Sequence, residues 1–85
     1  MTAAVRVQIS EDPTPDIVHR FRNFGEDVYR AVADKCSVNI DEIDAATTSF
    51  VVRNIRRQDI GVVTQLIKKQ LRQHNFGASG EVVRL

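Results

Sequence analysis

Basic side chains in the second half of the chain are the clearest candidates for a functional surface. Three of them lie in a five-residue stretch inside a segment whose apolar residues have helical spacing, and three more precede that segment. At about 100° per residue, the first three gather on the side of a helix opposite its apolar residues. Lysine and arginine on such a face can neutralise the charges of an anionic partner. The candidate binding residues are Arg53, Arg56, Arg57, Lys68, Lys69 and Arg72.

Charge is divided unevenly along the chain. Residues 1–49 carry five basic and nine acidic side chains, a net charge of −4, whereas residues 50–85 carry seven basic and two acidic ones, a net charge of +5. Such a division bears on partners and solubility rather than on fold. The second half is therefore expected to meet nucleic acid or an acidic protein surface. The alternative is a solvated helix face, with cations near the carboxyl end where the helix dipole favours them.

Side chains that could act as a nucleophile or a base are few. Cys36 is the single cysteine, and we expect it to be a buried structural thiol at the end of a helix. His19 stands among polar positions, and His74 falls at the end of an apolar stripe, which favours a packing or capping role. The acidic residues of segment 41–44 lack the spacing and glycine of a calcium loop, and no glycine motif for phosphates is present. We predict a non-enzymatic domain with no catalytic residue, cofactor or metal.

Length and composition predict one domain spanning residues 1–85. A single cysteine forms no intrachain disulfide, which is unusual for a small secreted domain. No apolar stretch is long enough for a signal peptide or a membrane span. We therefore expect a cytoplasmic protein without a membrane partner.

The amino-terminal half has one strand pattern and one helix pattern. Apolar residues alternate with polar ones over segment 5–9, as in a strand with one buried face. Thr14 followed by Pro15 predicts an N-cap and a first helical position. Apolar residues spaced by three and four then continue from Ile17 to Val32, the stripe of an amphipathic helix. Gly25 either allows this helix to approach a sheet closely or kinks it.

The carboxyl-terminal half predicts a strand over 49–55, a helix from Ile60 and a final strand over 81–85. Segment 42–47 has both turn-like and strand-like character. If it is a strand, the order is βαββαβ and the domain is an α+β, ferredoxin-like two-layer sandwich, with two helices on one face of an antiparallel sheet. If it is not, a three-stranded sheet with the same two helices remains.

The sheet face away from the helices is a second place for function. RNA-binding modules of this shape stack bases on aromatic residues there, but no pair of aromatic residues in a glycine-flanked run is present. Self-association is the alternative function, a homodimer in which two copies cover this face. We expect Val51, Ile55 and Val82 to be its exposed apolar residues.

Overall fold

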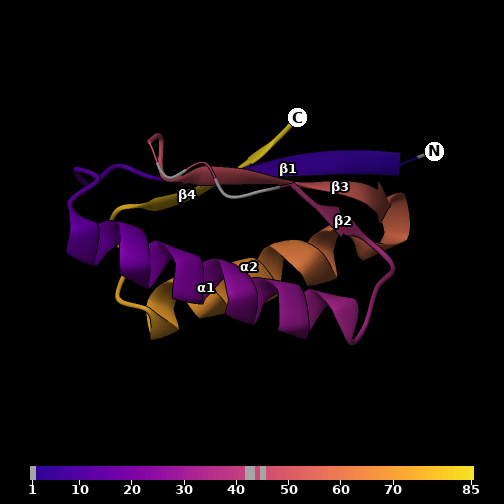
Figure 1. The fold of residues 1–85 in the computed structure, drawn as a ribbon. Helices are drawn as coiled ribbons and strands as arrows, with labels where there is room; N and C mark the ends of the chain where they lie inside the picture. The colour runs from indigo at the N-terminus through magenta and orange to yellow at the C-terminus, as the bar shows by residue number, and fades with distance from the viewer. Residues whose placement is uncertain (1, 42–43, 45) are drawn as a thin grey trace.

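A four-stranded antiparallel sheet carries both helices on one face (Figure 1). The computed structural model describes residues 2–41, 44 and 46–85. The elements are β1 (Thr2–Ile9), α1 (Pro15–Ala33), β2 (Asn39–Ile40), β3 (Ser49–Arg56), a 3-10 turn η1 (Arg57–Asp59), α2 (Ile60–Gln73) and β4 (Gly80–Arg84).

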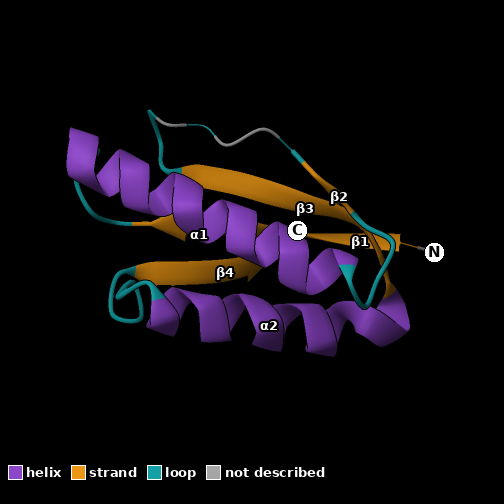
Figure 2. Ribbon diagram, turned by 60° about the horizontal axis from the view of Figure 1, so that its bottom comes forward, coloured by secondary structure: helices purple, strands orange, loops and turns teal. Residues whose placement is uncertain are grey.

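The strands lie in the order β2-β3-β1-β4. Since each neighbouring pair is antiparallel, each helix joins two parallel strands that have one strand between them, a split βαβ unit. Figure 2 shows α2 on the β4 side of the sheet. The predicted two-layer α+β sandwich is confirmed, and the three-stranded alternative is wrong.

The second strand lies earlier in the chain than segment 42–47. β2 covers Asn39–Ile40, whereas residues 46–48 form a turn. Asp44 makes only an isolated bridge to Ser49, and its carboxylate accepts the backbone N–H groups of Ala46 (3.0 Å) and Thr47 (3.4 Å). This side-chain bonding competes with strand pairing and turns the chain. Positions 42, 43 and 45 of the predicted segment lie outside the described residues.

The beginning of α1 agrees with the sequence. Thr14 Oγ1 accepts the backbone N–H of Ile17 at 3.3 Å, and Pro15 is the first helical residue. The helix runs unbroken through Gly25, which is buried. Its apolar stripe packs on the sheet in an aromatic core made by Phe21, Phe24, Phe50 and Phe76, in which the centroids of the contacting rings lie 5.5–6.3 Å apart.

A bulge in β3 decides which of its side chains face the helices. Ala3 pairs with Ile55 but Val5 pairs with Val52, so β3 carries one extra residue there. Asn54 takes a left-handed backbone conformation at this point, with φ 60°. The bulge shifts the strand's alternation by one residue, so Ile55 is fully buried rather than on the open face as predicted.

Val82 corrects the same prediction on β4. It pairs with the buried Val7 and packs against the core, so it also lies on the helix side. Val83 pairs with the exposed Arg6 and lies on the open face instead, 41% exposed. Phe50 is buried in the core, so the described part of the open face has no aromatic residue, in line with the sequence. The open face is thus mixed rather than broadly apolar.

No helix of the described residues is both long and apolar enough to cross a membrane.

Candidate functional site

The basic face of α2 is positioned by the apolar residues on its other side. Val63, Ile67 and Leu71 recur every four residues and are buried against the core. Their burial fixes the rotation of the helix about its axis, so that the opposite side faces solvent. Three exposed cations lie on that side, and α2 contains no acidic residue. We call this set, Lys68, Lys69 and Arg72, the basic face.

The cations of the basic face make no ion pair within the described part of the chain. Outside α2, three arginines each have a carboxylate partner, and the other lysines and arginines have none among the described residues. The nitrogen–oxygen distances are 3.9 Å for Arg20–Asp16, 3.6 Å for Arg30–Asp27 and 2.8 Å for Arg53–Asp41. The basic face therefore brings together three cations that have no carboxylate partner among the described residues and are available to an external anion.

A shallow hollow of about 510 Å³ lies on the outer surface of α2. Its floor is apolar, formed by the half-buried Leu66 and by Val62, which is 46% exposed. Gly61 at the start of the helix leaves this floor open, since no atom lies within 4 Å of where its Cβ would be. Lys69 and Arg72 also line the hollow. A ligand here would meet aliphatic carbon and cations together.

A second, smaller hollow of about 200 Å³ separates α2 from β4. Lys68 and Arg72 line it from the helix, and Gly80 and Val82 line it from the strand. The basic face therefore extends from the outer surface of α2 to the β4 edge of the sheet.

The structure divides the predicted binding residues into three groups. Lys68, Lys69 and Arg72 share one helix face, as predicted. Arg56 and Arg57 precede α2, at the end of β3 and in η1, whereas Lys68 lies about 12 Å along the helix axis from Ile60, the first residue of α2, at 1.5 Å per residue. Arg53 pairs with Asn39 and forms an ion pair with Asp41. It therefore lies on the open face of the sheet, away from α2. One compact site therefore includes only the first group.

A polar cluster between the helices is not predicted by the sequence. His74 Nε2 lies 2.8 Å from Asp27 Oδ2, and its ring packs edge-on against Phe24. Arg20 donates to the backbone oxygen of His74 at 3.0 Å and stacks on the Phe76 ring at 4.8 Å. These contacts join the carboxyl end of α2 to α1, which makes the cluster structural. No sequence signal pairs Asp27 with a histidine 47 residues later.

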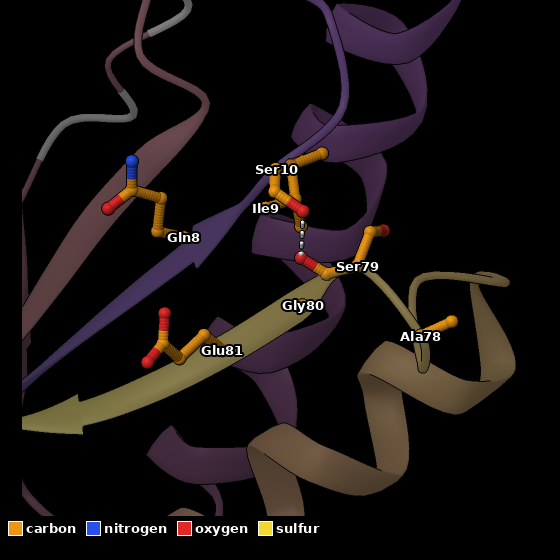
Figure 3. Close-up of a pocket in the computed structure, with 7 residues that line it drawn as sticks. All are labelled: Gln8, Ile9, Ser10, Ala78, Ser79, Gly80 and Glu81. Carbon is orange, nitrogen blue, oxygen red and sulfur yellow. Dashed lines mark hydrogen bonds between the residues drawn. The ribbon is translucent and has the colours of Figure 1, made fainter.

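A polar hollow of about 400 Å³ lies where β1 ends and β4 begins (Figure 3). The hydroxyl and backbone N–H of Ser10 both donate to the backbone oxygen of Ser79, at 3.3 Å and 3.0 Å. The Ser79 hydroxyl donates to Glu11 at 2.7 Å. These bonds use the serine hydroxyls to join two loops, and no histidine lines the hollow to activate them.

The remaining candidates for chemistry are separate from one another. Cys36 is half-buried against the core beyond the end of α1, and His19 is exposed, 3.4 Å from the Asn23 amide. No cluster of potential metal ligands occurs in the described residues. No known protein family model matches the chain, and no curated protein is significantly similar to it in sequence.

Proposed function

We propose that this domain is a non-enzymatic binding or regulatory module that recognises an anionic partner through the basic face of α2. The observation that supports this function is the clustering of three exposed cations without an ion-pair partner among the described residues, Lys68, Lys69 and Arg72, on one face of a helix that carries no carboxylate. An anionic group that binds this face forms an ion pair with one of these cations, and no ion pair among the described residues has to be broken for it. Arg57 and Arg56 extend the surface towards the beginning of α2.

The partner is a nucleic acid or an acidic protein surface. A nucleic acid would be bound by its phosphates, because the described open face offers no aromatic ring for base stacking. Binding by charge alone weakens steeply with salt, since each phosphate contact releases a condensed counterion. An acidic protein would also use the aliphatic floor formed by Val62 and Leu66.

The test is a pair of charge-reversal variants with the same change in net charge. Lys68→Glu with Lys69→Glu changes the basic face, whereas Arg22→Glu with Lys35→Glu changes two exposed cations elsewhere. Arg22 lies about 200° around α1 from Arg20, on the flank away from α2. Both double variants move the formal net charge from +1 to −3.

Binding is measured by fluorescence anisotropy of a labelled oligonucleotide and of a labelled polyglutamate over a series of salt concentrations. We expect the basic-face variant to lose at least tenfold in affinity for the preferred polyanion, and the control variant to lose less than threefold. Circular dichroism verifies that both remain folded. An equal loss in both would mean that only net charge matters, and full binding by the basic-face variant would refute the proposed function.

A further inference from the structure

The outer edge of β4 is an open strand edge. β4 is the last strand in the sheet order, and no described strand pairs with its other side. Leu85 N–H donates to the Ala4 oxygen at 2.9 Å, so Val83 also directs its backbone groups towards β1. Because backbone groups alternate along an antiparallel strand, the N–H and C=O groups of Val82 and Arg84 point outwards. They form a row of donors and acceptors available to another chain.

The two sides of this edge differ in chemistry. On the helix side, Val82 lies beside Lys68 and Arg72, and Arg84 occupies the same side because it pairs with the buried Val5. On the open side, Val83 and the following Leu85 are 41% and 56% exposed, and the exposed Glu81 lies on the same side near the start of β4 because it pairs with Gln8. The edge is therefore cationic towards the helices and, from Val83 onwards, apolar towards the open face.

We propose that the anionic partner is an acidic polypeptide segment that adds to β4 as an extended strand. Its backbone would bond to Val82 and Arg84, and its side chains would point alternately to the two sides of the sheet. Carboxylates at every second position would meet Lys68, Arg72 and Arg84. The intervening apolar side chains would pack beside Val83 on the open face. This inference rests on the proposed function and names the class of partner.

Charge complementarity favours such a segment over a second copy of this chain. Two β4 strands paired antiparallel about a twofold axis would place both helices on the same side of the joined sheet. Lys68 and Arg84 of each copy would then face the same cations of the other, a like-charge contact of the kind that discourages edge pairing. A nucleic acid would satisfy the cations but has no regular backbone N–H and C=O groups for the edge.

The experiment compares two labelled peptides of identical composition. In the first, glutamate alternates with valine; in the second, the glutamates and valines are in separate blocks. We expect the alternating peptide to bind at least tenfold more tightly. On saturation, amide hydrogen exchange measured by NMR should slow at least tenfold at Val82 and Arg84. Val83 should change little, since its amide already faces β1.

Arg84→Pro adds an independent test, because it removes an outward N–H that pairs with no described strand. We expect it to weaken alternating-peptide binding several-fold more than Arg84→Ala, which removes the same charge. Peptide binding without protection at Val82 and Arg84 would overturn the strand addition. So would preference for an oligonucleotide, or protection at both amides by self-association without peptide. In those cases, a loss of affinity for the preferred polyanion in the variant Lys68→Glu with Lys69→Glu would still support the proposed function.

Discussion

Gly80 is the position where the packing of β4 against α2 is most sensitive to a single methyl group. In Gly80→Ala, the new Cβ would lie 2.5 Å from Leu71 Cδ2 and 2.7 Å from the backbone oxygen of Phe76. Leu71 can change rotamer, but the Phe76 oxygen belongs to the backbone and already accepts the Gly80 N–H at 2.7 Å. The start of β4 must therefore move away from the helix.

The size of the effect follows from the cost of inserting carbon into a packed site. Overpacking of this kind costs about 1–3 kcal/mol, and we expect about 2 kcal/mol because a backbone atom is one of the two clashing partners. For a domain of this length, 1 kcal/mol corresponds to roughly 4–8 °C in Tm. Gly80→Ala should therefore lower Tm by roughly 8–16 °C.

Two other glycines provide matched controls, measured by urea denaturation followed by circular dichroism. Gly77→Ala places its Cβ 3.5 Å from Arg72 Cγ, an ordinary contact, so stability should stay within about 0.5 kcal/mol. Gly61→Ala meets no atom within 4 Å and lies in α2, so it should gain about 0.5–1 kcal/mol. If Gly80→Ala is as stable as Gly77→Ala, the close contact between β4 and the turn after α2 is incorrect.

Two further substitutions test the local structure. Thr14→Ala removes the oxygen that caps α1 and should cost about 1 kcal/mol in urea denaturation, whereas Thr14→Ser should retain most of it; equal stability of both would contradict the cap. Asn54→Ala forces alanine into the left-handed conformation of the β3 bulge and also removes the hydrogen bond from Asn54 to Asn39. Its stability should fall by about 1–2 kcal/mol, and Asn54→Gly should recover part of that loss; an Asn54→Gly variant no more stable than Asn54→Ala would contradict the bulge.

The sequence predicts elements whose signals are local. The apolar stripe from Ile17 to Val32 requires a helix to bury it, and Thr14-Pro15 marks where the helix begins. The β-branched and aromatic residues of segment 49–55 predict β3 in the same way. The basic face of α2 also follows from helical spacing, because rotation about the axis places Lys68, Lys69 and Arg72 opposite the buried residues.

What the sequence does not predict depends on contacts between distant segments. The bulge at Asn54 appears only when β3 is aligned with β1, and it reverses the side on which Ile55 lies. Asp44 favours a turn through its own side chain, and the described residues 46–48 form that turn rather than a strand paired like Asn39–Ile40 in β2. Arg53 has strand character and positive charge, but only the fold reveals Asp41 as its partner.

The most direct test of the central claim is an NMR titration that locates the bound polyanion on the surface. The labelled protein is titrated with the alternating acidic peptide and, separately, with an oligonucleotide at low salt. We expect the largest chemical-shift changes to follow the exposed side of α2 from Gly61 to Arg72 and, for the peptide, to continue onto β4. Changes centred on α1 or on the β2–β3 side of the open face, with α2 unaffected, would contradict it.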